Sequence, residues 1–234
     1  MNYPAGAGGY WWLREFEMNW YGPNIPLKLL LLSLTLMLVI PSISTGADVE
    51  FRWAVLAGSK AEGMEPLDFT GSPIVFSGTD LQIYVEHLNN CYIYLFLLDS
   101  GSELTPLYPS EKGYYDYGFP RGPKFIPPGD NTFSFVPPAG LERIYLIGSE
   151  VRLFQIEKLT EIYNESSTNA QRDLLLSEIK TILDEYESAS LKGEKRRKAQ
   201  RKSRTAEGIV STSFYATEVA VSERYGRVIT IDHR

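Results

Sequence analysis

Cysteine and histidine are scarce in this chain. Of its 234 residues only Cys91 is a cysteine, and only His87 and His233 are histidines. A single cysteine excludes a disulfide framework and any zinc site that needs several cysteines. Two histidines leave little material for catalysis by imidazole. We expect Cys91, which lies in an apolar segment, to be a buried inert thiol and both histidines to be exposed surface residues.

No charge or hydrophobicity extreme marks the composition. Hydrophobic residues make up 44% of the chain and charged residues 22%, with 23 Lys and Arg against 29 Asp and Glu and a net charge of −6. This balance is typical of a globular protein and excludes a disordered chain.

An apolar run near the N-terminus is too short for a membrane span. Residues 29–40 carry no charge and are followed by small residues up to Ala47. A spanning helix needs about 20 apolar residues, so we favour a secretory signal peptide cleaved after Ala47, with an uncleaved anchor as the alternative. Residues 1–17 do not suit a basic leader, which makes Met18 the more natural start. The pattern predicts an exported protein, periplasmic or extracellular.

Short apolar segments separated by glycine and proline follow in residues 48–150. Residues 80–86 alternate strictly, as a half-buried strand does, and residues 91–98 are apolar on both faces, as a central strand is. Together with residues 103–108 they predict a β-meander. Further strands are predicted at residues 51–56, 125–128, 132–136 and 142–149. Regular strands with proline corners predict an Ig-like β-sandwich.

The period changes from strand to helix after residue 150. Residues 151–163 have apolar positions at helical spacing, and Thr168-x-x-Gln171 is a capping box that begins a longer helix. That helix carries one apolar stripe, formed by Leu175, Ile179, Ile182 and Tyr186. The prediction is a single, mainly β domain, α+β overall with a two-helix appendage: a β-sandwich at 48–150, a helical segment with a basic run at 151–205, and C-terminal strands at 206–234.

Three stretches resemble one bacterial family. Residues 78–84 (Gly-Thr-Asp-Leu-Gln-Ile-Tyr) are similar to its Gly-Asp-x-Leu-x-Ile opening, residues 91–109 to its next two strands, and residues 126–149 to its closing half. This is the domain-of-unknown-function family numbered 4384, and the resemblance covers residues 75–150. It implies a small non-catalytic β-sandwich, often appended to caspase-like peptidases or protein kinases, with no catalytic residues to carry over. Without such a catalytic partner, this chain resembles the free-standing exported members.

The loop at residues 110–124 is rich in glycine and aromatic residues. Rings around Asp116 are of the kind that binds sugars, so a hydrolase that uses Asp116 with Asp130 or Glu142 is one alternative. No spacing ties these carboxylates together, and we favour a lid packed over the sandwich edge or a contact surface. The candidate contact residues are Tyr114, Tyr115, Tyr117 and Phe119.

Metal binding is not expected. Residues 99–103 superficially resemble a calcium loop but lack its ladder of carboxylates. A hairpin turn explains this segment, and we predict no metal, no cofactor and no catalytic residues.

The sharpest local charge is a basic run at residues 192–204. It holds eight Lys and Arg residues and one acidic residue, Glu194. Aromatic residues that would stack bases are not interleaved with it, so no nucleic acid is expected. Two interpretations remain: a solvated helix end or linker that faces the acidic remainder, or a contact with anionic lipid or cell-wall polymer. The candidate contact residues are Lys195, Arg196, Arg197, Lys198, Arg201 and Lys202.

These features favour an exported, non-enzymatic binding or scaffolding module of the bacterial cell envelope, with an envelope protein as its partner. The alternatives are an envelope hydrolase with paired carboxylates and an electrostatic tether to anionic membrane or cell-wall polymer. No oligomeric state is predicted.

Overall fold

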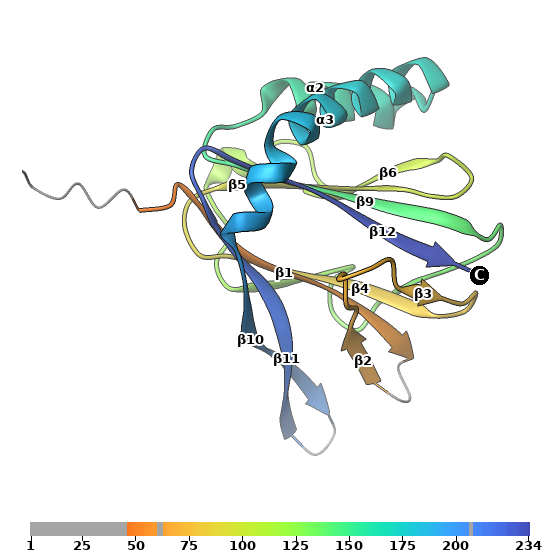
Figure 1. The fold of residues 1–234 in the computed structure, drawn as a ribbon, viewed down its shortest axis with the longest axis vertical. Coiled ribbons are helices and arrows are strands. Elements are labelled where there is room, and N and C mark those ends of the chain that lie inside the picture. The colour runs from red at the N-terminus through yellow and green to blue at the C-terminus, as the bar shows by residue number, and fades with distance from the viewer. Residues whose placement is uncertain (1–45, 60–62, 206–207) are drawn as a thin grey trace, which may run out of the picture. The chain divides into compact units, whose positions relative to one another are not determined.

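Two β-sheets, each assembled from segments far apart in the sequence, face each other across an apolar core (Figure 1). The computed structural model describes residues 46–59, 63–205 and 208–234. The predicted signal peptide lies almost entirely outside them. The first sheet has the order β10 (Glu194–Thr205), β11 (Gly208–Val221), β1 (Val49–Ser59), β4 (Asp80–His87), β7 (Pro123–Ile126), with β2 (Gly63–Pro66) paired to β1 and β8 (Phe133–Ser134) to β4. The second has the order β3 (Ile74–Val75), β12 (Arg224–His233), β9 (Gly140–Ser149), β5 (Tyr92–Leu98), β6 (Leu104–Tyr108).

Inward-facing side chains of both sheets fill the space between them. Phe51 and Val55 of β1 belong to the same buried cluster as Ile93 and Leu95 of β5. Alternate residues of a strand point to opposite faces, so this core follows from the alternation seen in the sequence. The α+β fold with a β-sandwich-like core is confirmed.

Two helices, α2 (Phe154–Ser166) and α3 (Asn169–Ser190), cover the outer face of the second sheet (Figure 1). The predicted stripe of α3 makes this contact: Leu175 and Ile179 are fully buried in one cluster with Ile147 of β9. Within the described part of the chain, no helix is long and apolar enough to cross a membrane.

The sequence determines how α3 begins and how it docks. Thr168 is its N-cap, and the hydroxyl oxygen accepts a hydrogen bond from Gln171 N–H at 3.4 Å, as the capping box predicts. At the sheet, a Cβ on Gly226 would lie 3.2 Å from Leu183 Cδ2. The missing side chain therefore lets α3 lie close to β12, where Gly226 N–H donates to Ser190 Oγ at 2.8 Å.

The predicted β-meander of residues 80–108 is wrong. β4 pairs with β1 and β7 in the first sheet, whereas β5 pairs with β9 and β6 in the second. The link between them crosses from sheet to sheet, and Asn89 fixes it by accepting from Glu50 N–H and donating to the carbonyl of Asp48, both at 3.1 Å. Alternation identifies a strand but not its partner. Of the meander, only the β5–β6 hairpin exists.

The basic run is a strand, which corrects both the helical segment at 151–205 and the expected helix end or linker. It forms β10, which pairs with β11 along its whole length. The β10–β11 hairpin follows β1 as far as Trp53. Farther along, it lies over the outer face of the first sheet, where the rings of Phe214 and Tyr84 are 5.1 Å apart. The apolar residues of β11 make the contact with the sheet. The sequence of the basic run alone therefore does not indicate that it forms a strand.

The β10–β11 hairpin also explains why β4 is not half buried as predicted. Gln82 and Tyr84, which point outward, are as buried as the inward-facing Ile83. Tyr84 lies between Phe214 of the hairpin and Phe125 of β7. The outer face of the first sheet thus has a small core of its own.

Candidate functional site

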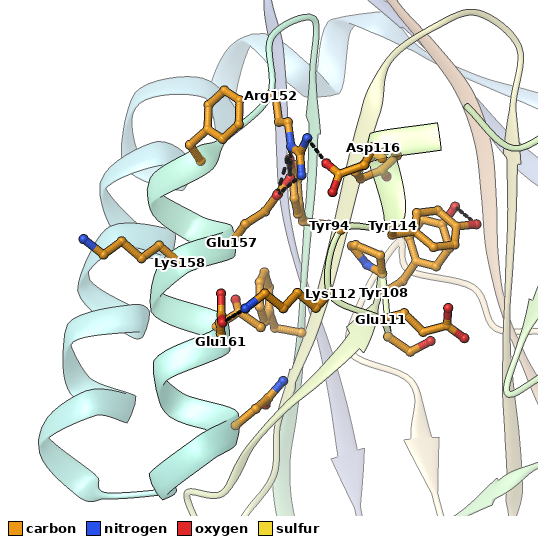
Figure 2. A pocket seen from close by; sticks show the side chains of 18 of the residues that line it. Tyr94, Tyr108, Glu111, Lys112, Tyr114, Asp116, Arg152, Glu157, Lys158 and Glu161 are labelled. Atoms are coloured by element: carbon orange, nitrogen blue, oxygen red, sulfur yellow. Dashed lines mark hydrogen bonds and ion pairs between the residues drawn. The ribbon is translucent and has the colours of Figure 1, made fainter. Parts of the chain in front are cut away.

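A cleft of about 500 Å³ lies between the aromatic loop and α2 (Figure 2). One wall is the loop at residues 109–116, which contains the start of a 3-10 helix, η1 (Tyr114–Tyr117), and the other wall is α2. Tyr94 of β5 and Tyr108 of β6 contribute to its lining from the sheet. The sheet therefore lines the cleft between a loop on one side and a helix on the other.

Tyr115 fixes the loop wall to β5. Its hydroxyl accepts from Ile93 N–H and donates to the Ile93 carbonyl, each at 2.8 Å. β6 pairs with β5 only from Leu95 onward, so the tyrosine satisfies backbone groups that the neighbouring strand leaves open. Burial raises the pKa of Tyr115. The side chain is part of the core rather than of the free surface.

The four predicted aromatic contact residues have different surroundings. Tyr114 and Tyr115 line the cleft, and Tyr117 and Phe119 do not. The ring of Phe119 lies 4.9 Å from that of Tyr92 and is half buried. Tyr117 is 98% exposed. The loop is therefore a packed lid at Tyr115 and Phe119, a cleft wall at Tyr114 and open surface at Tyr117.

Two ion pairs connect the loop to the helical side of the cleft (Figure 2). Arg152, just before α2, reaches Glu157 with Nη2–Oε2 at 2.7 Å and Asp116 of the loop with Nη1–Oδ1 at 2.5 Å. Hydrogen bonds to Glu157 and then Asp116 raise the pKa of Arg152. Lys112 of the loop pairs with Glu161 of α2. The Asp116 carboxylate is thus engaged by a cation.

Acidic groups outnumber basic groups around the cleft. Lys158, one of three basic residues, points away from the loop (Figure 2). The acidic residues are Glu111, Asp116, Glu157, Glu161 and Glu165, and the basic residues are Lys112, Arg152 and Lys158. With aromatic rings at its base, the cleft offers complementary surroundings for a ligand that carries both apolar and basic groups.

Both histidines are buried, so the expectation of exposed surface histidines is wrong. Each lies at the end of a strand, but other segments cover that end. His87 Nδ1 donates to the Cys91 carbonyl at 3.0 Å, which leaves Nε2 to accept from the Tyr108 hydroxyl at 3.0 Å. The Tyr108 oxygen lies 3.0 Å from the hydroxyl of Tyr114 in the cleft wall. Burial lowers the pKa of His87 to about 4, so the ring is neutral at pH 7.

Cys91 is a buried thiol, as predicted. Its side chain is fully buried, and Sγ lies 3.6 Å from the carbonyl oxygen of Glu50. Burial raises the pKa of the thiol to about 12, so it stays protonated and unreactive near neutral pH.

The structure does not bring together the three carboxylates of the hydrolase alternative. Asp116 pairs with Arg152 in the cleft. Asp130 pairs with Arg201 of β10, with Nη2–Oδ1 at 3.2 Å. Glu142 is buried in β9 and does not line this cleft. Each carboxylate has separate surroundings.

The candidate basic residues divide between the two faces of β10. Lys195, Arg197 and Arg201 share the face of the buried Ala199, by the alternation of the strand. Arg197 on this face pairs with Glu218 at 3.2 Å. The opposite face carries three exposed cations: Arg196, Lys198 and Lys202. Arg196 on that face lies over the ring of Tyr215, with Cζ 4.3 Å from the ring centroid. The basic run therefore combines cations that pack on the sandwich with exposed lysines.

Several cleft residues escaped prediction because no sequence pattern joins them. Arg152 and Glu157 are five residues apart, outside the usual helical pairing distances. Arg152 bonds Asp116 of the loop, and Glu157 accepts from the Tyr94 hydroxyl of β5. Comparisons of the chain with family models, curated proteins and solved structures find no match. The resemblance to the family numbered 4384 therefore stays a prediction.

Proposed function

We propose that this protein is an exported binding or scaffolding module of the bacterial cell envelope, and that its cleft takes a segment of an envelope protein partner. The observation that carries the proposal is the cleft of about 500 Å³, walled by the loop that the sequence singles out as a contact surface. Export is proposed from the apolar run at residues 29–40. Concave sites with aromatic linings and a few polar groups are the usual form of binding sites.

The chemistry of the cleft favours a partner segment with a basic side chain next to an apolar one. The Lys112 side chain is 76% exposed, so its pair with Glu161 contributes little stability and is readily exchanged. A basic group of the partner would replace Lys112 on Glu161, and Phe154 at the cleft rim would contact the apolar group. Asp116 and Glu157 share one guanidinium, which supports a role for them in shaping the cleft rather than in catalysis.

Affinity capture followed by binding measurements on the captured partner tests this proposal. The partner is identified from the native envelope and its affinity is then measured with purified variants. Phe154→Ala with Glu165→Lys changes two exposed cleft residues, and we expect affinity to fall at least about tenfold. The matched control is Tyr117→Ala, an exposed aromatic of the same loop outside the cleft, which should change affinity less than about twofold. Equal effects of both variants would refute the cleft as the binding site.

A second candidate, electrostatic tethering to anionic membrane, is supported by the exposed basic face of β10, where Arg196 also stacks on Tyr215. Arg196, Lys198 and Lys202 point to one side and are exposed, a geometry that attracts anionic headgroups. Their triple alanine variant should lose binding to phosphatidylglycerol vesicles at low salt. The control removes three exposed cations elsewhere, through Arg121→Ala, Lys158→Ala and Lys180→Ala. If both triple variants lose binding alike, net charge alone is responsible and the β10 face is not a specific contact.

A further inference from the structure

At the C-terminal end of β12, two hydrogen bonds join a serine, a histidine and a carboxylate. Ser77 Oγ lies 2.9 Å from His233 Nε2, and His233 Nδ1 lies 3.3 Å from Glu142 Oε1. Because a carboxylate only accepts, Nδ1 carries the ring proton and Nε2 accepts from the Ser77 hydroxyl. This is the order of nucleophile, base and orienting carboxylate found in serine acyl transferases and hydrolases.

Three distant segments build this group. His233 lies in β12 between β9, where it is paired with Gly140, and β3, where it is paired with Val75. Figure 1 shows the C-terminus of the chain beside β3. Ser77 follows β3, and its N–H donates to the Arg234 carbonyl at 3.0 Å. The main chain therefore sets the serine opposite the imidazole.

Burial differs among the three groups in the way a nucleophile site requires. His233 and Glu142 are buried, and the His233 ring lies 5.3 Å from the ring of Phe135. Ser77 is exposed. The base and its carboxylate are shielded from water, whereas the serine is open to solvent.

The structure shows no acyl pocket at Ser77 within the described residues. A cavity of about 150 Å³ is lined by Phe135 and Glu142 but not by Ser77 or His233. Phe76, next to Ser77 in the sequence, is 64% exposed. The expected substrate is therefore a small reactive ester that reaches the exposed Ser77 from solvent, and no particular acyl chain is selected.

We propose that Ser77, His233 and Glu142 form a nucleophile site that hydrolyses reactive esters of carboxylic acids. Ser77 Oγ attacks the carbonyl carbon and gives its proton to His233 Nε2. The bond from that carbon to the alcohol oxygen breaks, and the alcohol leaves with this proton. Water then attacks the acyl-serine in the same way, releasing the acid and restoring Ser77. This activity goes beyond the binding function and would make the chain an enzyme.

The backbone around Ser77 limits the chemistry to reactive substrates. The N–H groups of Ser77 and Gly78 already donate to the carbonyls of Arg234 and Phe135, at 3.0 and 2.8 Å, so they do not form an oxyanion hole. Loss of one oxyanion donor typically slows acyl transfer by about 10²–10³. We therefore expect turnover of aryl esters and not of amides.

A fluorophosphonate probe and para-nitrophenyl butyrate test the proposal on the full chain. Mass spectrometry of the labelled, unsubstituted protein should place the adduct on Ser77. Ser77→Ala should lose the adduct and reduce ester turnover at least about 100-fold. The matched control is Ser72→Ala, an exposed serine on the other side of β3, which should keep both.

Buried variants add a second measurement. His233→Gln and Glu142→Gln should slow labelling of Ser77 by at least about tenfold in protein that circular dichroism shows to be folded. The decisive result comes from the unsubstituted chain, so poor folding of either variant leaves it unaffected. An unlabelled Ser77 in folded protein, or turnover that survives Ser77→Ala, overturns the proposal. Phe154→Ala should leave labelling unchanged, which separates this site from the binding cleft.

Discussion

The two outer faces of the sandwich are covered by opposite means. α2 and α3 cover the second sheet with an apolar stripe that includes the fully buried Leu175 and Ile179. The β10–β11 hairpin covers the first sheet with a much smaller apolar contact, made chiefly by Ala199, Phe214 and Ala216. Polar bonds supply the rest of the hairpin contact, so the two covers differ in what stabilises them.

The polar bonds of the hairpin are concentrated at two places. Arg52 of β1 bonds Glu218 of β11, with Nη2–Oε2 at 2.7 Å. Arg201 of β10 donates to Gln82 Oε1 at 2.7 Å. Apolar burial contributes in proportion to area, about 25 cal/mol per Å², whereas partly exposed ion pairs contribute about 0–1 kcal/mol. The helical cover should therefore unfold only with the core, and the hairpin should also open locally.

The largest effect is expected from the helical cover. Ile179→Ala removes a fully buried side chain and should lower the free energy of unfolding by about 2–5 kcal/mol, measured by chemical denaturation. Phe214→Ala in the hairpin removes a larger side chain, yet we expect a smaller loss because the hairpin can open by itself. A greater loss for Phe214→Ala would show that the hairpin is as integral to the fold as the helices.

Gln82 provides the next largest effect. Its Nε2 lies 3.0 Å from each of three carbonyls, in Pro127, Gly129 and Asn131, in a side chain with no exposed surface. Gln82→Leu leaves these acceptors without their donor and should lower the free energy of unfolding by about 1–3 kcal/mol. Hydrogen exchange should also rise in β10, because Arg201 loses its acceptor. Gln200→Leu, an exposed position of β10, is the control and should change little.

The same contrast explains what the sequence could predict. The stripe of α3 and its cap at Thr168 are local patterns, and both are confirmed by the structure. β10 carries no apolar alternation, because its contact face is made of Ala199 and the arms of arginines. The partner of a strand also depends on residues far away in the sequence. The local pattern therefore predicts one meander for β4 and β5, which lie in different sheets.

The candidate sites follow the same rule. The aromatic loop was visible in the sequence as a cluster of rings, and two of its members line the cleft. Its partner wall on α2 was not visible, because the contacts join residues far apart along the chain. We expected His233 to be an exposed surface residue, yet pairing of its strand with β3 and β9 buries it. The position of His233 in the sequence does not indicate that it is buried.

The ion pairs of the hairpin should give a smaller effect that depends on pH. Hydrogen bonds from Arg52 hold the pKa of Glu218 below its usual value. A folded-state pKa below the unfolded one contributes stability above the unfolded pKa, near 4.3, and this contribution is lost as pH falls through the folded value. Glu218→Gln should cost about 1 kcal/mol at pH 7, and this cost should shrink as the pH falls below the unfolded pKa.

Denaturation curves at several pH values measure this difference. The control on the helical cover is Asp184→Asn, an exposed carboxylate of α3, for which we expect a difference within about 0.5 kcal/mol at every pH. A gap for Glu218→Gln that persists unchanged at pH 3 would mean that packing of the side chain, and not its charge, stabilises the hairpin.

The smallest effect on stability is expected at Lys198 and Lys202. They lie on β10, whose strand edge can pair with another molecule, whereas the helical cover has no such edge. Among the described strands β10 pairs only with β11, so its outer edge has unpaired backbone groups, and lysines on an edge oppose association with another strand. Lys198→Gln with Lys202→Gln should change the free energy of unfolding by less than about 0.5 kcal/mol but increase light scattering at high protein concentration.

The control for this prediction is Lys158→Gln with Lys180→Gln on the helices. It changes the net charge equally, but the backbone groups of helices are satisfied internally, so light scattering should not increase. Both pairs make the chain more acidic, so association of the β10 variant alone would locate the effect at the edge, and association of both or neither would contradict it.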